Sequence, residues 1–163
     1  MADPAVWTRV LAFLLLLAPL ATTAGRAQQG EAGRETRAQR LVEETLRRHP
    51  QLTGVELAVV SDQGCAVLAA TDLALLGEKC GDDEERPMKT GEPNVEEPTV
   101  NEPVYDITQA LHDSSGRLLG TFAMDIKPKP GQDRAAMVSL ARTILREIEA
   151  QIPSKEKLFE RVK

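Results

Sequence analysis

The residues of this chain that could bind a ligand are two carboxylates and two hydroxyls on neighbouring segments, namely Asp106, Thr108, Thr121 and Asp125. They alternate with apolar residues along two runs, Val104–His112 and Arg117–Ile126. Carboxylates hold cationic groups through charge-assisted hydrogen bonds, and hydroxyls both donate and accept. This pattern indicates recognition of a small polar molecule.

The two runs are joined by Asp113-Ser114-Ser115-Gly116, which predicts a β-hairpin. A turn centred between the two serines pairs Asp106 with Ala123 and Thr108 with Thr121, so these side chains share one face. The opposite face is predicted to pack in the core and carries Tyr105, Ile107, Gln109, Leu111, Leu118, Gly120, Phe122 and Met124. The polar face either meets water, as antiparallel sheets commonly allow, or lines a pocket.

The connector 71–103 favours the pocket. It is acidic and interrupted by glycine and proline, and a connector of this length in a compact domain is usually functional or disordered. If helices cover the core face, the connector must cross the polar face. We expect a short helix at Asp82–Lys89, then an extended path with an edge strand near Val95–Val100.

Two cations of the connector could reach the polar face. Arg86 and Lys89 could pair with Asp106 or Asp125, or receive an anionic group of the ligand. The alternative is that both are solvated surface cations.

Flanking elements complete the fold. Apolar residues at helical spacing predict an N-terminal helix within 28–50 and a C-terminal helix at about 132–151. Val55–Ser61 and Cys65–Ala70 are predicted to form a first hairpin. The order predicts an α+β fold, with an antiparallel sheet of about five strands between amphipathic helices, in one domain over 51–152. Residues 153–163 are predicted to be a charged tail.

The order of motifs has a family resemblance. "TD…LGEKC", "MKTGEP" and "VYDITQAL.D.SGRLLGTFAMDI" follow one another between Val55 and Ile126. This order resembles the ligand-sensing half of Cache domains, the PAS-like (PDC-type) extracytoplasmic sensors. The resemblance implies a PAS/Cache-like sheet and small-molecule sensing.

The resemblance also implies a role for one acid. In Cache domains that bind amino acids, an acid near the end of the last strand holds the ligand amine, and Asp125 stands at that place. The arginine and Trp-Tyr pair that hold the ligand carboxylate there have no counterpart, because Trp7 lies in the leader and Tyr105 on the predicted core face. We therefore expect amine recognition without expecting amino-acid specificity.

The N-terminus predicts export. Arg9 precedes the apolar run Val10–Ala18, and small residues follow, as in a secretory signal peptide spanning 1–27. Cleavage is expected after Ala24 or Ala27. An uncleaved anchor is the alternative, although the run is short for a membrane span. The mature protein would be periplasmic or secreted, with no membrane span.

Cys65 and Cys80 are the only cysteines, and an oxidising compartment favours a disulfide between them. Two free thiols, or half of a metal site, are the alternatives. A metal site is disfavoured because neither histidine lies at ligand spacing from a cysteine. No Cys-x-x-Cys redox or haem motif is present, so we expect no metal and no cofactor.

Composition and motifs argue against several other functions. The net charge of −5, with no basic cluster free of acids, disfavours nucleic-acid binding. His112 beside Asp113 and Ser114 is better explained by turn chemistry than by a nucleophile with its base. Aromatic residues are 3% of the chain, which disfavours sugar stacking around an aspartate pair, and no phosphate loop is present. We predict no enzymatic activity.

The sequence thus predicts an exported sensor-type module that binds a small polar ligand, amine-bearing on the resemblance, under the connector. It would act through an unidentified partner such as a membrane receptor or transporter. The alternative is a non-catalytic structural or protein-interaction module of the same fold without a ligand. Two amphipathic helices leave room for a homodimer.

Overall fold

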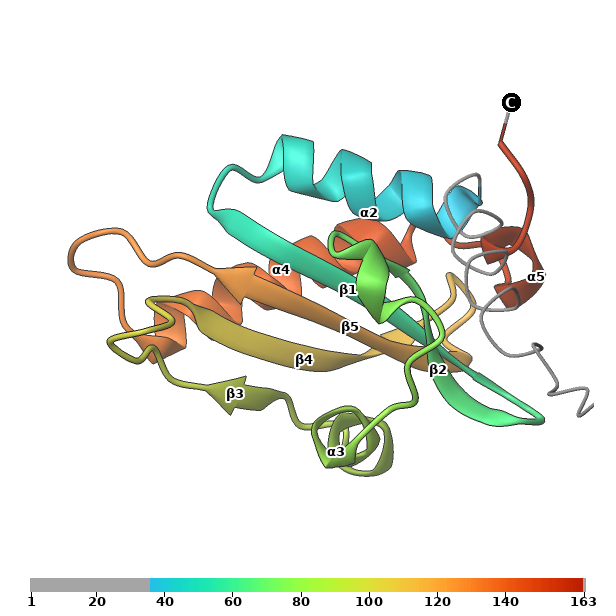
Figure 1. Ribbon diagram of the computed structural model, residues 1–163, viewed down its shortest axis with the longest axis horizontal. Coiled ribbons are helices and arrows are strands. Elements are labelled where there is room, and N and C mark those ends of the chain that lie inside the picture. The colour runs from blue at the N-terminus through green and yellow to red at the C-terminus, as the bar shows by residue number, and fades with distance from the viewer. Residues whose placement is uncertain (1–35, 163) are drawn as a thin grey trace, which may run out of the picture.

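The computed structural model describes residues 36–162 (Figure 1). The predicted signal peptide, 1–27, lies outside these residues. A five-stranded antiparallel sheet in the order β2-β1-β5-β4-β3 forms the centre of the molecule. Its strands are β1 Leu52–Ser61, β2 Gly64–Ala70, β3 Asn94–Glu96, β4 Tyr105–His112 and β5 Leu118–Ile126. The α+β fold with about five strands is confirmed.

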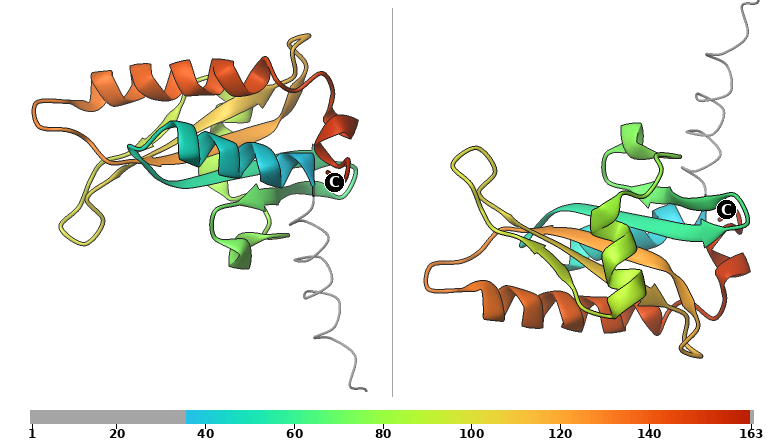
Figure 2. Two further views of the ribbon diagram at one scale, coloured as in Figure 1. Left: turned by 90° about the horizontal axis from the view of Figure 1, so that it is seen from above. Right: turned by 90° about the horizontal axis from the view of Figure 1, so that it is seen from below.

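Helices α2 (Arg37–Arg48) and α4 (Arg134–Glu149) pack on one face of the sheet. The connector forms the 3-10 helix η1 (Leu73–Leu75), then α3 (Asp82–Thr90), and lies on the other face (Figure 2). The predicted connector helix and edge strand are therefore present, although β3 is shorter than expected. Across the described range 36–162, no helix is long and apolar enough to cross a membrane.

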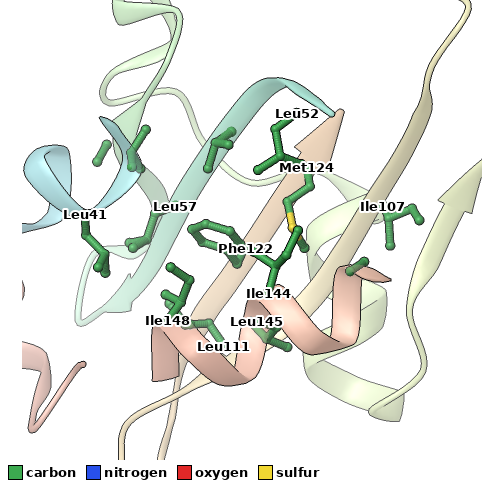
Figure 3. Packing of buried hydrophobic residues seen from close by; sticks show 14 of the residues in the cluster. Leu41, Leu52, Leu57, Ile107, Leu111, Phe122, Met124, Ile144, Leu145 and Ile148 are labelled. Atoms are coloured by element: carbon green, nitrogen blue, oxygen red, sulfur yellow. The ribbon is translucent and has the colours of Figure 1, made fainter. Parts of the chain in front are cut away.

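The core lies between the sheet and the two long helices. Both helices begin with a side-chain cap: Thr36 accepts a hydrogen bond from the Gln39 amide at 3.2 Å, and Asp133 from the Ala136 amide at 2.9 Å. Their apolar stripes share one core cluster with residues of the last two strands, Tyr105, Ile107 and Leu111 of β4 and Leu119, Phe122, Met124 and Ile126 of β5. In Figure 3, Phe122 is surrounded by side chains of the sheet and of α4.

The hairpin register differs from the prediction by two residues. Asp106 pairs with Asp125, and Thr108 pairs with Ala123. The loop holds three residues, closed by a 2.9 Å hydrogen bond from the Asp113 amide to the Arg117 carbonyl. A bulge in β5 then adds one further residue. A shift of two keeps every side chain beyond the bulge on its predicted face.

Because of the bulge, two leucines lie on the faces opposite to those predicted for them. Leu118 was expected in the core but is 45% exposed, whereas Leu119 was expected on the polar face but is buried in the core cluster. Gly120 follows the bulge, and a Cβ there would lie 2.1 Å from the Ala58 carbonyl oxygen. The close approach of β1 to β5 therefore requires glycine at this position.

The turn is held by a buried aspartate. Asp113 accepts hydrogen bonds from the Ser115 hydroxyl at 2.6 Å and from the Arg117 amide at 3.0 Å. These bonds, that of Ser115 first, hold the pKa of Asp113 well below its usual range. Turn chemistry thus accounts for this segment, as the sequence predicted.

The predicted charged tail, 153–163, also contains an ordered turn of helix, α5 (Lys155–Leu158). Leu158 is 1% exposed and belongs to the core. The Arg37 amide donates to the Glu160 carbonyl at 2.8 Å, which joins the tail to the start of α2. One buried leucine in a charged segment gives too weak a periodicity to predict this helix.

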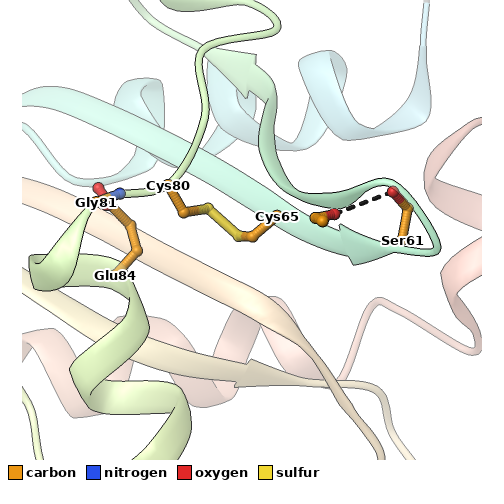
Figure 4. Close-up of a disulfide and its surroundings, with 6 residues drawn as sticks. Ser61, Cys65, Cys80, Gly81 and Glu84 are labelled. Carbon is orange, nitrogen blue, oxygen red and sulfur yellow. Dashed lines mark hydrogen bonds between the residues drawn. A yellow bond between two sulfur atoms is a disulfide. The ribbon is translucent and has the colours of Figure 1, made fainter.

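The disulfide between Cys65 and Cys80 is present, with a Cα–Cα distance of 5.3 Å (Figure 4). It joins β2 to the residue before the N-cap of α3, where the Gly81 amide donates to Glu84 at 2.6 Å. The Val67 amide also donates to the Glu78 carbonyl at 2.8 Å, so the connector covers the edge of β2. The disulfide and this pairing together hold the start of α3 against β2. We call α3 the lid, because it lies over the face of the sheet opposite α2 and α4 (Figure 2).

We predict that replacing both cysteines by alanine lowers the free energy of unfolding by about 3 kcal/mol, the value expected for a loop of about 15 residues. Urea denaturation of the double variant beside the oxidised parent measures this loss. Equal midpoints would contradict the prediction. Intact mass of natively exported protein, alkylated without reductant, tests the bond itself: two alkylated cysteines would show that it is absent.

Candidate functional site

Three carboxylates from three strands lie on the face of the sheet opposite α2 and α4. Asp106 on β4 lies opposite Asp125 on β5, and Asp125 in turn lies opposite Gly54 on β1. Glu56, two residues after Gly54, shares this face. The observed register, which differs from the predicted one by two residues, places the two aspartates directly opposite each other.

These carboxylates line a pocket of about 180 Å³ under the first part of the connector. Its floor is formed by residues of β1, β4 and β5, and its wall by Thr71, Asp72 and Leu75. The wall is fixed to the sheet, because the Thr71 hydroxyl accepts a 3.0 Å hydrogen bond from the Val55 amide. Asp72 caps η1 by accepting from the Ala74 amide at 2.9 Å.

Gly54 makes room for one of the carboxylates. A Cβ at this position would lie 2.1 Å from Oδ2 of Asp125. The carboxylate of Asp125 therefore lies directly over the β1 backbone. Any side chain larger than hydrogen at position 54 would displace it.

The surroundings of the three carboxylates raise their pKa values. Burial, followed by repulsion from Glu84 and Asp106, raises the pKa of Glu56 from 4.5 to about 7. Burial, followed by repulsion from Asp125, raises the pKa of Asp106 from 3.8 to about 7. Burial also raises the pKa of Asp125. A bound cation would relieve this repulsion.

The pocket supplies no cation of its own. Its lining includes no lysine or arginine. Oδ1 of Asp106 is buried and has no hydrogen-bond partner. No group of three or more His, Cys, Asp or Glu residues within 36–162 is arranged to hold a metal ion. The carboxylates thus form a charge cluster that lacks the geometry of a metal site.

The other predicted site residues lie outside this pocket. Thr108 and Thr121 are on the same face but are 2% and 1% exposed, beyond the pocket lining. Lys89 bonds Glu85 at 2.6 Å on the surface of α3. Arg86 lies 3.5 Å from the side-chain oxygen of Asn94 and lines a separate groove. The structure does not bring either cation to Asp106 or Asp125.

Glu56 is the site residue that sequence reasoning missed. The segment Gly54-Val55-Glu56-Leu57 already contains the signal, because a lone acid two residues after a glycine in an otherwise apolar strand must face away from the core. Its neighbours could not be identified without the pairing of β1 with β5. That pairing joins strands far apart in the sequence.

No family model and no curated protein matches this chain. Several solved structures are similar to this chain. A protein described as a GAF sensor from Burkholderia vietnamiensis is 14% identical, with 88% of this chain and 98% of that chain covered and a TM-score of 0.49. The sensor domain of DcuS from E. coli is 17% identical over 78% of this chain and 86% of that chain, with a TM-score of 0.43.

An enzyme is also among the similar structures. The type II free methionine-R-sulfoxide reductase from Thermoplasma acidophilum is 12% identical over 76% of this chain and 96% of that chain, with a TM-score of 0.42. Similarities at this level assign no function to the chain.

The carboxylate cluster predicts a pH-dependent stability. A raised pKa means that the folded state holds its proton more tightly than the unfolded chain, so this stabilisation is complete below the unfolded values of 4.5 and 3.8. It is lost as the pH rises through about 7. Glu56→Gln should therefore reduce the loss of stability between pH 5 and pH 8, measured by urea denaturation at each pH. Parallel profiles for parent and variant would show that Glu56 does not titrate in this way.

Proposed function

We propose that this protein is an exported sensor-type module that binds a small amine-bearing molecule in the acidic pocket. The observation that carries the proposal is the set of three half-buried carboxylates, Glu56, Asp106 and Asp125, with raised pKa values and no cation among the residues that line the pocket. Such a cluster is costly for the unliganded fold. A ligand with a positive charge is the partner that its chemistry selects.

The dimensions of the pocket restrict the ligand. Its volume of about 180 Å³ lies below the range of roughly 300–1,000 Å³ typical of sites for drug-sized molecules. A primary ammonium group offers three donors on a compact charge, which suits carboxylates from three strands. Oδ1 of Asp106, which lacks a partner, is one acceptor for these donors.

Binding would also couple to protons. An ammonium group beside Glu56 and Asp106 lowers their pKa values, so the complex releases protons near pH 7. The affinity for an amine should then rise between pH 6 and pH 8, as long as the amine itself stays protonated. A ligand bound only by the pocket walls would show no such dependence.

The wall of the pocket offers a route from ligand to partner. Thr71, Asp72 and η1 border the site, and the connector continues through the disulfide at Cys80 into α3. A change at the wall would therefore alter the outer surface of η1 and of the connector beside it. A membrane receptor or transporter is the kind of partner that would respond to it. The disulfide supports the export in this proposal, because such bonds persist in oxidising compartments.

A second candidate function is a protein-interaction module without a ligand. The observation that favours it is Val100, which is fully exposed at 101% in the loop between β3 and β4. A thermal-shift screen of the mature protein against amines, amino acids, carboxylates and nucleobases separates the two candidates. Ligand binding raises the melting temperature by mass action. A flat response to every amine would favour the interaction module.

We predict that Asp125→Asn, which keeps the shape and removes the charge, weakens the binding of an amine found in that screen. A charge-assisted hydrogen bond contributes about 1.5–3 kcal/mol, so the affinity should fall roughly tenfold or more, as measured by calorimetry. Gly54→Ala should act in the same direction by displacing the Asp125 carboxylate. Asp62→Asn, in the exposed turn between β1 and β2, is the matched control and should bind as the parent does.

Two results would contradict the assignment of this site. One is an Asp125→Asn variant that binds the amine as tightly as the parent. The other is calorimetry in phosphate and in Tris that reports the same enthalpy, because proton release makes the measured enthalpy depend on the ionisation enthalpy of the buffer.

A further inference from the structure

A second pocket opens at the edge of the sheet, beside the part of β4 that does not pair with β3. It has a volume of about 470 Å³ and lies between α3 and α4. No residue lines both this pocket and the acidic one. Apolar side chains form much of its wall, among them Met88, Leu118 and Leu145. Its size and composition are those of a site for a small organic molecule.

Gln109 gives this pocket an unused hydrogen-bond donor. The residue lines the pocket and is 5% exposed, and its amide nitrogen Nε2 is buried with no hydrogen-bond partner. It lies on the core-facing side of β4, between Ile107 and Leu111. A glutamine in such a position is costly to the fold unless an acceptor meets it. An acceptor atom of a ligand would remove that cost.

Arg142 gives the same pocket a positive charge. It projects from α4, and the structure shows no hydrogen bond or ion pair of its side chain within 36–162. The acid that lines the pocket, Glu149, already accepts from the amide of His112 at 2.9 Å and lies 3.1 Å from its ring. Of the charged side chains that line the pocket, Arg142 is therefore the one available to a ligand.

The groove beside this pocket strengthens the attraction for anions. Arg142 and Leu145 line both, and the groove is also lined by Arg134 and Arg146 of α4 and by Arg86 of α3. Glu97 bridges Arg134 at 3.5 Å, and Glu92 and Asp133 also line the groove, so its charge is partly compensated. In a chain of net charge −5, four arginines along one groove still attract anions toward the pocket.

We propose that this pocket binds a small organic carboxylate with an apolar body. The carboxylate accepts hydrogen bonds from the amide of Gln109 and the guanidinium of Arg142, and the body packs on Met88, Leu118 and Leu145. Arginine suits this role because its planar fork matches a carboxylate. The site takes an anion, so it is independent of the amine site proposed above.

Benzoate and hexanoate are suitable probes, with benzamide and benzylamine as matched neutral and cationic compounds. Titration of ¹⁵N-labelled protein should move the side-chain amide signals of Gln109, assigned by their loss in Gln109→Leu. Arg142→Gln should weaken benzoate binding roughly tenfold. Arg47→Gln removes the same charge from the exposed surface of α2, where the residue lines neither the pocket nor the groove, and should bind benzoate within about twofold of the parent.

Gln109→Leu gives a second, independent readout. Since it removes an unpaired buried amide and keeps the side-chain volume, it should leave the melting temperature of the free protein unchanged or raise it, while abolishing the benzoate-induced shift. A lower melting temperature would show that Gln109 has a structural partner, and would overturn the proposal. Equal losses in the two arginine variants, or no movement of the Gln109 signals with either acid up to about 10 mM, would overturn it as well.

Discussion

The pairing of β4 with β5 is the constraint on which the acidic pocket depends. It sets Asp106 directly opposite Asp125, although like charges in this arrangement destabilise a sheet. Two features of the pocket accommodate that pair. Gly54 leaves space above the β1 backbone for one carboxylate, and proton uptake lessens the charge of the other. Glu56 extends the cluster to a third strand, and η1 closes it from above.

The two candidate sites offer a ligand groups of opposite charge, and both are lined by strand β4. Side chains at Asp106 and Gln109 on β4 face opposite surfaces, so one strand supplies an acceptor to the first pocket and a donor to the second. Helix α3 lies near both, since Glu84 raises the pKa of Glu56 and Met88 lines the second pocket. A shift of α3 would therefore change both environments.

Much of the fold could be predicted from local patterns, because helix stripes, turn residues and strand alternation each depend on neighbours in the sequence. The prediction of which β4 side chains face the core was correct despite the error in register, because a shift of two residues leaves each side chain on the same face of the sheet. The bulge at Leu119 could not be predicted, because it arises where Gly120 meets the backbone of Ala58 on a distant strand. Glu56 lies in the site because β1 pairs with β5, a strand far from it in the sequence. Arg86 and Lys89 could have reached the polar face or stayed solvated; in the structure Lys89 bonds Glu85 on the surface of α3 and Arg86 lines the groove beside α4.

The disulfide between β2 and the start of α3 separates two parts of the chain with different freedom to change. The paired strands before Cys80 and after Asn94 fix the scaffold, and the segment between them lines the second pocket without contributing to the pairing of β1, β4 and β5. Substitutions and length changes in this segment can therefore alter which molecules fit while the scaffold folds as before. The disulfide thus confines such changes to the segment that covers the pocket and leaves the paired strands of the sheet unaltered.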